Sequence, residues 1–223
     1  LEGVKKHRRQ HRALRKKQQI PTFALIGYTN SGKSTLLNQL TNAHALVKDQ
    51  VFATLDPTTK KVHLSETGPA VLTDTVGFIR KLPAHLIEAF KATLEESAEA
   101  DVLLHVVDLA SPVMEQQIHI VEELMKEFGW HTKPIIHVFN KIDKAPFEKQ
   151  FQVKAFPRVF VSAVTGEGMD KLRRQMTVAI QALNQQVELY FPREDEYKIY
   201  ELGREPQIVK TEAASTGTIC YAS

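Results

Sequence analysis

The chain has 223 residues, of which 43% are hydrophobic and 25% charged, and its formal net charge is +3. These values are typical of a globular domain and exclude disorder, collagen or a coiled-coil rod as the whole structure. No apolar run approaches the ~18 residues of a membrane helix, and the single cysteine excludes an internal disulfide and a Cys-rich zinc site, so we expect an intracellular protein with no membrane partner.

The first part of the chain is strongly basic. Residues 1–19 hold one acid, Glu2, and eight basic side chains: Lys5, Lys6, Arg8, Arg9, Arg12, Arg15, Lys16 and Lys17. Because the chain opens with Leu1 inside a helix-compatible run, we interpret residues 1–19 as a basic helical linker from a missing N-terminal domain. This segment either contacts a phosphate backbone, with an affinity that falls with salt, or is simply a solvated helix.

From residue 20 onward, short apolar runs alternate with helical patterns. We predict strands at 23–26, 62–64, 70–73, 102–107, 135–139 and 159–161, with helical runs at 35–40 and 115–128 between them. Ser111 is a candidate N-cap with Pro112 at the first helical position, and Gly129 is a candidate C-cap. Two stripes at helical spacing should face the core: Leu86, Phe90, Leu94 and Ser97, and then Met169, Leu172, Met176, Ile180 and Leu183.

This alternation predicts an α/β fold, with a mostly parallel sheet covered by helices on both faces, across residues 20–184. The alternation stops after residue 184, and residues 185–223 should form a small, strand-containing C-terminal domain. In such a sheet, ligands gather at the carboxyl ends of the strands.

A phosphate-binding loop follows the first predicted strand. The pattern G-x-x-x-x-G-K-[S/T] is matched by Gly27, Tyr28, Thr29, Asn30, Ser31, Gly32, Lys33 and Ser34, and Thr35 begins the next helix. The glycines let the backbone wrap phosphates, and the helix N-terminus adds positive charge. Lys33 should neutralise the β and γ phosphates, and Ser34 should offer its hydroxyl to Mg²⁺.

Two later segments favour guanine over adenine. Asn140-Lys141-Ile142-Asp143 follows a strand and matches the N-K-x-D signature, in which the Asp143 carboxylate accepts two N–H bonds from the guanine edge. Ser162-Ala163-Val164 is similar to the S-A-K loop behind the base. Val164 replaces the lysine, but the backbone N–H of Ala163 is kept.

Metal and γ-phosphate contacts are predicted in two further segments. Asp74-Thr75-Val76-Gly77 fits D-x-x-G, with Asp74 holding Mg²⁺ through water and the Gly77 N–H contacting the γ phosphate. The hydroxyl-rich stretch 52–59 suits a switch that closes over the nucleotide. Its first residues are Phe52, Ala53, Thr54, Leu55 and Asp56, and several of its threonines compete as the metal ligand.

Together these strings resemble the HflX family of translational GTPases. The matching stretches are 27–35, 52–59, 74–83 and 92–96, in order and before Asp101. The resemblance implies that Thr54 is the metal threonine, with Thr59 the runner-up. It also implies GTP and GDP as ligands and a cytoplasmic, ribosome-associated switch on the large subunit that splits or rescues ribosomes. We expect a monomer.

The residue after D-x-x-G bears on the rate of hydrolysis. Many small GTPases have a water-orienting glutamine there, whereas this chain has Phe78, which cannot hydrogen-bond through its side chain. Water positioning then comes from the backbone, from another side chain brought by the closing switch, or from a partner such as the ribosome, which we favour. The other interpretation, that Phe78 is a hydrophobic anchor of the switch with no catalytic role, is compatible with this one. Some G domains with an asparagine at the position of Asn30 bind K⁺ beside the phosphates. A K⁺ ion near Asn30 is therefore a second candidate for the group that completes the active site. A nucleotide-gated scaffold with negligible turnover is the alternative function.

Overall fold

The structure is a computed structural model that describes residues 20–41, 58–65, 67–78, 98–183, 187–199 and 208–222. The chain divides into two compact units, residues 1–179 and 180–223. The dividing point lies inside helix α6 (Met169–Leu183), a few residues before the 184/185 domain boundary that the sequence suggested.

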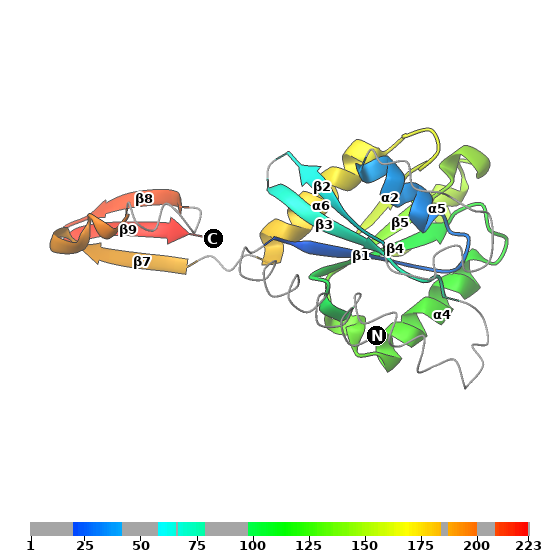
Figure 1. Ribbon diagram of the computed structural model, residues 1–223, viewed down its shortest axis with the longest axis horizontal. Helices are drawn as coiled ribbons and strands as arrows, with labels where there is room; N and C mark the ends of the chain where they lie inside the picture. The colour runs from blue at the N-terminus through cyan, green and yellow to red at the C-terminus, as the bar shows by residue number, and fades with distance from the viewer. Residues whose placement is uncertain are drawn as a thin grey trace. The chain divides into compact units, whose positions relative to one another are not determined.

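The first unit is built on a six-stranded sheet in the order β2-β3-β1-β4-β5-β6 (Figure 1). Its strands are β1 (Thr22–Ile26), β2 (Thr58–Leu64), β3 (Gly68–Asp74), β4 (Val102–Asp108), β5 (Ile135–Asn140) and β6 (Arg158–Phe160). Only the edge pair β2–β3 is antiparallel. This confirms the predicted α/β fold with a mostly parallel sheet.

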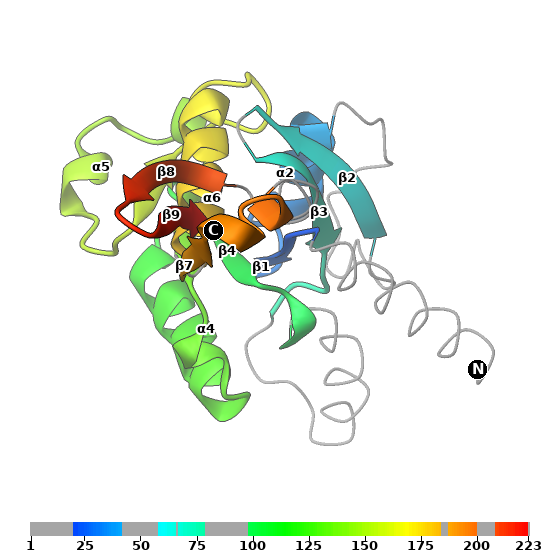
Figure 2. The same cartoon turned by 90° about the vertical axis from the view of Figure 1, so that its left-hand side faces the viewer.

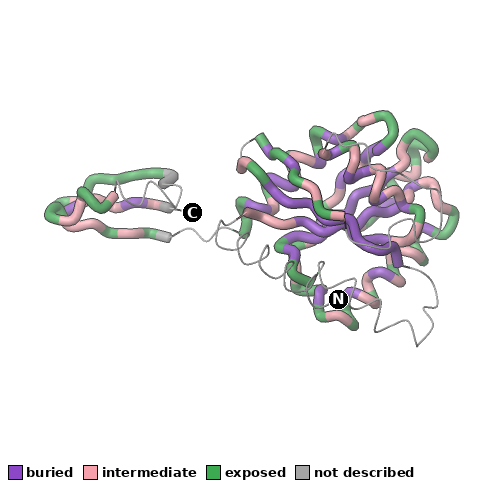
Figure 3. The backbone as a smooth tube through the Cα atoms, viewed as in Figure 1, coloured by how far each residue is buried: buried purple, intermediate pink, exposed green. Residues whose placement is uncertain are grey.

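Helices cover both faces of this sheet. Helix α4 (Met114–Glu127) packs Val121 and Met125 into a buried cluster with Ala24, Ile26 and Leu103. Because side chains alternate along a strand, Phe23 and Leu25 point to the opposite face, where α2 (Lys33–Thr41) and α6 lie. The central strands are therefore buried on both sides, as Figure 3 shows.

The described ends of helix α4 contradict one expectation and confirm another. Helix α4 begins at Met114 with Val113 as its N-cap residue and no side-chain cap. Ser111 instead accepts a hydrogen bond from the Val113 N–H at 3.3 Å, closing a turn before the helix, so it is not the N-cap. Gly129 follows the C-cap residue with a φ of 72°, the left-handed conformation that glycine adopts freely.

The two apolar stripes predicted at helical spacing have different outcomes. In α6, Met169, Leu172, Met176 and Ile180 are buried, but Leu183 in the last turn is exposed. The stripe from Leu86 to Ser97 lies outside the described residues, as does the basic segment 1–19.

Short elements complete the first unit. They are the single-turn helices η1 (Trp130–Thr132), η2 (Ile142–Lys144) and α5 (Lys149–Gln152). Within the first unit, Figure 2 shows α5 on the side opposite β2 and β3. Within the described ranges, no helix is both long and apolar enough to cross a membrane.

The second unit is a three-stranded antiparallel sheet. Its strands β7 (Val187–Pro192), β8 (Ile208–Ala214) and β9 (Gly217–Ala222) lie in the order β7-β9-β8, with η3 (Arg193–Asp195) after β7. Cys220 on the central strand is buried and carries a free thiol.

Two histidines are buried beside each other in the main sheet. His105 on β4 and His137 on β5 are in register, and their ring centroids lie 5.4 Å apart. Neither Nδ1 atom has a hydrogen-bond partner within the described part of the chain. Burial, then the neighbouring His137 and Lys33, lower the pKa of His105 to about 3, and burial also lowers the pKa of His137. Both rings are therefore neutral at pH 7.

This pair should make the chain sensitive to mild acid. A lowered pKa means that the unfolded chain binds the proton first, so stability present above about pH 6.5 is lost as the pH falls toward 3. For His105 alone the loss at about pH 5 is about 2 kcal/mol. Denaturant unfolding at about pH 7.5 and about pH 5 measures it.

The matched control uses an exposed histidine. His105→Leu should reduce the loss of unfolding free energy between the two pH values, whereas His119→Leu, on the surface of α4, should leave it unchanged. An equal acid loss in the parent and in His105→Leu would contradict this account.

Candidate functional site

The phosphate-loop residues lie between β1 and α2, at the carboxyl edge of the sheet. Gly27 and Gly32 have φ values of 146° and 93°. A Cβ atom at Gly27 would lie 2.2 Å from the Val106 carbonyl oxygen, and one at Gly32 would lie 2.3 Å from Asn140 Nδ2. Both close approaches and both backbone angles require glycine.

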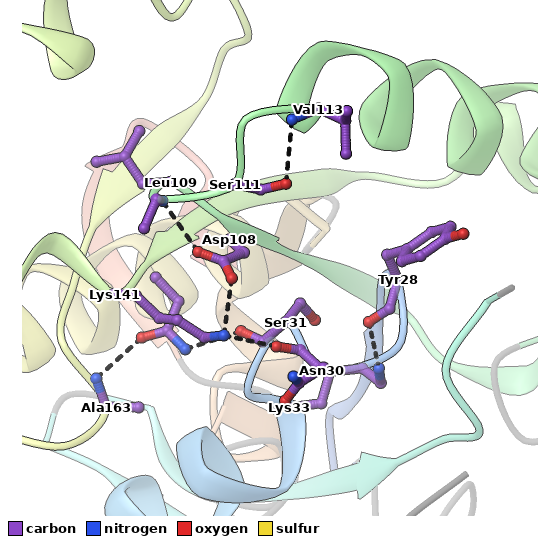
Figure 4. Close-up of polar contacts among 12 residues, drawn as sticks. Tyr28, Asn30, Ser31, Lys33, Asp108, Leu109, Ser111, Val113, Lys141 and Ala163 are labelled. Carbon is purple, nitrogen blue, oxygen red and sulfur yellow. Dashed lines mark hydrogen bonds and ion pairs between the residues drawn. The ribbon is translucent and has the colours of Figure 1, made fainter. Parts of the chain in front are cut away.

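Lys33 points back into the loop. Its Nζ donates to the carbonyls of Gly27 at 3.2 Å and Tyr28 at 3.0 Å, and Figure 4 shows the Lys33–Tyr28 contact. Burial lowers the pKa of Lys33 to about 8, against the opposing effect of the Asp74 carboxylate. A buried ammonium held by carbonyls suits an anionic ligand, because a phosphate would supply the counter-charge that the protein leaves incomplete.

Ser31 is a second buried polar group in this loop. It is almost fully buried, and its hydroxyl has no hydrogen-bond partner among the described residues. An unsatisfied buried hydroxyl carries a free-energy cost, and a polar ligand inside the loop would remove it.

Ser34 and Asp74 meet at the start of α2. The Ser34 hydroxyl donates to Asp74 Oδ2 at 2.5 Å. A hydroxyl and a carboxylate are hard oxygen donors, and Mg²⁺ binds through few protein ligands plus waters and phosphates. The pair fits the predicted magnesium site, and no group of three or more His, Cys, Asp or Glu side chains suited to a metal occurs in the described ranges.

The D-x-x-G segment packs directly on the phosphate loop. A Cβ atom at Gly77 would lie 2.8 Å from Thr29 Cα and 2.9 Å from Lys33 Nζ. Thr75 turns away, donating its hydroxyl to the Leu25 carbonyl at 2.6 Å, and Val76 is buried. The backbone of Gly77 therefore lies beside both Thr29 and Lys33, with no room for a side chain.

Phe78 ends the described part of this segment with its side chain in the core. The Phe78 N–H donates to Gly27 at 3.0 Å, and its carbonyl accepts from the Thr29 N–H at 2.8 Å. The ring is fully buried in the cluster beneath α4. This placement makes Phe78 a hydrophobic anchor that joins D-x-x-G to the phosphate loop.

The Asn140 side chain joins two loops. Its Nδ2 donates to the Ser31 carbonyl at 2.9 Å, and its Oδ1 accepts from the Ala163 N–H at 3.0 Å. Asp143, in η2, is exposed, and Val164 is also exposed. The Ser162 hydroxyl accepts from the Thr165 N–H at 3.1 Å, which shapes the turn after Ala163.

Asp108 belongs to this site but was missed by the motif analysis. Lys141 Nζ lies 2.7 Å from Asp108 Oδ2 and also donates to the Asn30 carbonyl at 2.7 Å. The other Asp108 oxygen accepts from the Ala110 N–H at 2.9 Å. Figure 4 shows this network. The only sequence signal was an acid at the end of a buried strand, where ligands gather.

The switch prediction is tested only at its end. Phe52, Ala53, Thr54, Leu55 and Asp56 lie outside the described residues. Thr59, the runner-up metal ligand, is in β2, paired with Thr73, with the two hydroxyls 3.2 Å apart. Thr59 therefore lies in the edge strand β2 rather than in a loop, and its role as the alternative metal ligand stays a prediction. Thr35 lies in α2, partly buried.

Comparisons with known proteins agree with this geometry. A family profile described as "50S ribosome-binding GTPase" matches residues 22–141. The chain is 45% identical over its whole length to the GTPase HflX of Lacrimispora saccharolytica, of which it covers 53%. It is 46% identical over 87% of its length to the GTPase HflX of Caldanaerobacter subterraneus, covering 45% of that protein. The chain thus spans about half the length of these curated relatives.

A solved structure shows a similar fold. It is a GTP-binding protein from the archaeon Sulfolobus solfataricus in complex with GDP, which is 26% identical to this chain. The TM-score is 0.62, and the match covers 82% of this chain and 61% of that one.

Proposed function

The chain belongs to the family of 50S ribosome-binding GTPases, and we propose that it binds GTP with Mg²⁺ and hydrolyses it to GDP and phosphate as a switch on the large ribosomal subunit. The observation that carries the proposal is the buried Lys33, which bonds to the phosphate loop and lies beside Gly77 of D-x-x-G. Asn140 of the guanine loop bonds to the same phosphate loop through Ser31. Similarity to HflX GTPases extends the proposal to splitting or rescue of ribosomes in the cytoplasm, with the chain acting as a monomer.

The described residues divide the work of nucleotide binding. Lys33 would exchange its carbonyl partners for the β and γ phosphates, with the loop N–H groups around them. Ser34 and Asp74, with Thr54 from the switch, would hold Mg²⁺, which neutralises charge on the same phosphates. The Gly77 N–H would contact the γ phosphate, and Asp143 would accept the guanine N–H groups.

Asn140 and Lys141 would act mainly by joining loops. Asn140 contacts both the phosphate loop and Ala163, and Lys141 ties Asn30 to Asp108. Base recognition and phosphate binding would therefore depend on each other, since a displaced guanine loop also displaces the phosphate loop.

The side chain of Phe78 cannot orient the attacking water by hydrogen bonding. Phe78 stands where small GTPases place glutamine, and its ring is buried in the core. A ribosomal element, or a K⁺ ion near Asn30, would complete the transition-state site. Asn30 has a φ of 61°, an unusual value for a residue other than glycine, so its loop position is held by its surroundings.

Turnover measurements test this proposal. We expect slow GTP hydrolysis by the chain alone and faster hydrolysis with isolated large subunits, and also with K⁺ in place of Na⁺. An arginine finger contributes ~10³ to 10⁵ in rate, so completing the site should raise turnover at least about tenfold. Phosphate release in single-turnover assays measures the effect.

Asn30→Ala separates the two sources of stimulation. This variant should lose the K⁺ effect and keep both nucleotide binding and stimulation by subunits. Turnover that is negligible in every condition, with tight GTP binding intact, would instead favour the nucleotide-gated scaffold. Equal turnover alone, in Na⁺ and with subunits would mean that the site is already complete.

A further inference from the structure

Three phenylalanines between β5 and β6 face solvent. Phe147, Phe151 and Phe156 are 63%, 74% and 70% exposed. Scattered exposed apolar residues are ordinary, but large apolar side chains gathered in one segment mark a site of interaction. The α5 aromatic surface is defined here by these three rings together with Lys144, Lys154 and Arg158.

The segment that carries the rings is attached firmly to the domain. Lys149 Nζ donates to the carbonyls of Leu109 at 3.3 Å, Ala110 at 3.4 Å and Ser111 at 3.3 Å. Val153 is buried in a cluster with side chains of β4, β5 and α4, and Arg158 donates to the Val153 carbonyl. The exposed rings are therefore carried by a segment that is packed and hydrogen-bonded to the rest of the domain.

Two of the rings contact each other, and the third lies beside a cation. Phe147 and Phe151 meet edge to face, with centroids 5.3 Å apart and planes at 88°. The Arg158 guanidinium carbon lies 4.1 Å from the Phe156 ring centroid, a cation–π contact. An exposed ring beside a cation resembles the stacking platforms that bind unpaired nucleotides.

The positive charge of residues 141–158 indicates which class of partner fits this surface. Between residues 141 and 158 there are five basic side chains, Lys141, Lys144, Lys149, Lys154 and Arg158, and two acidic ones, Asp143 and Glu148. Lys144 and Lys154 are exposed. Protein interfaces are depleted in lysine at their core, whereas aromatic rings interleaved with cations suit phosphates and bases.

We propose that the α5 aromatic surface binds single-stranded or looped RNA, with bases stacked on the phenylalanines and phosphates near Lys144, Lys154 and Arg158. The choice of RNA rests in part on the proposed ribosomal function. The three phenylalanines of this surface lie beyond the guanine-binding segment 140–143, which ends next to Lys144.

RNA binding by substituted chains tests the proposal. The probe is a short, fluorescein-labelled single-stranded RNA, followed by fluorescence anisotropy at low salt. Phe147→Ser, Phe151→Ser and Phe156→Ser should each weaken binding about fivefold or more, as loss of a stacking ring does. Lys154→Ala should weaken binding and flatten its salt dependence by one phosphate contact, ~0.7 in the slope. Because the three rings are exposed, the substitutions should leave the thermal unfolding temperature unchanged.

Tyr197→Ser is the matched control, because Tyr197 is 60% exposed on the second unit and should not alter RNA affinity. Equal affinity of the parent and the three phenylalanine variants would assign RNA binding elsewhere, for example to residues 1–19, and would overturn the proposal. So would a parent that binds no RNA, or variants that lose binding to large subunits but keep RNA affinity, since the partner would then be a protein.

GTP binding by the same variants is measured in parallel. GTP affinity should equal that of the parent, because none of the three phenylalanines is among the residues that we assign to nucleotide binding. A parent that binds RNA but not GTP would refute the proposed function and leave the RNA surface standing, so the two failures are distinguishable.

Discussion

Lys33→Met is expected to abolish tight GTP binding while leaving the nucleotide-free chain at least as stable as the parent. The ammonium is buried against two carbonyls, and burial lowers its pKa to about 8. A lowered lysine pKa is a cost that the folded chain carries at neutral pH and that fades as the pH rises from about 8 toward 10.5. Methionine keeps the length of the side chain and removes this cost.

The same change should abolish tight GTP binding, since the γ and β phosphates lose a buried cation. Titration calorimetry with GTP and Mg²⁺ measures the binding, and denaturant unfolding at neutral pH measures a gain of about 1–3 kcal/mol without nucleotide. Lys126→Met, on the exposed face of α4, is the control and should change neither quantity. Parent-like GTP binding by Lys33→Met would show that the loop is not the phosphate site.

Asp143→Asn should switch the preferred base from guanine to xanthine. The carboxylate accepts two guanine N–H bonds, whereas an amide offers a donor that matches the xanthine carbonyl. Sites built around such hydrogen bonds reject an analogue that lacks them by ~10⁴, so GTP affinity should fall by about 10³ or more. Since Asp143 is exposed in η2, the fold should be unaffected.

Competition binding with GTP and xanthosine triphosphate measures the switch. Asp170→Asn, an exposed acid in the first turn of α6, is the control and should keep the preference for GTP. If Asp143→Asn binds GTP as the parent does, the N-K-x-D assignment is wrong.

The sequence alone was sufficient for the fold class and the phosphate loop. Both depend on local order: apolar strands alternate with helices, and the two loop glycines stand at fixed distances from Lys33. The observed φ values at Gly27 and Gly32 show why glycine was informative, because no other residue tolerates these angles and contacts together. The exposed Asp143 was equally readable, since its predicted role needs only a strand end and a spacing.

Residues whose roles depend on distant partners were settled only by the tertiary structure. Asp108 contacts Lys141 because β4 and β5 are adjacent and in register, and no local pattern predicts such a neighbour. Thr59 lies in a strand because pairing with β3 makes β2 begin four residues before the predicted start.

The same reason explains Phe78 and Asn140. Whether Phe78 served catalysis or packing depended on where its ring lay, and it lies in a core assembled from β1, β4 and α4. Asn140 carries the expected signature, but its bonds to Ser31 and Ala163 join segments 109 and 23 residues away. Motifs are written in consecutive residues, whereas burial and hydrogen-bond partners are decided by which strands lie side by side.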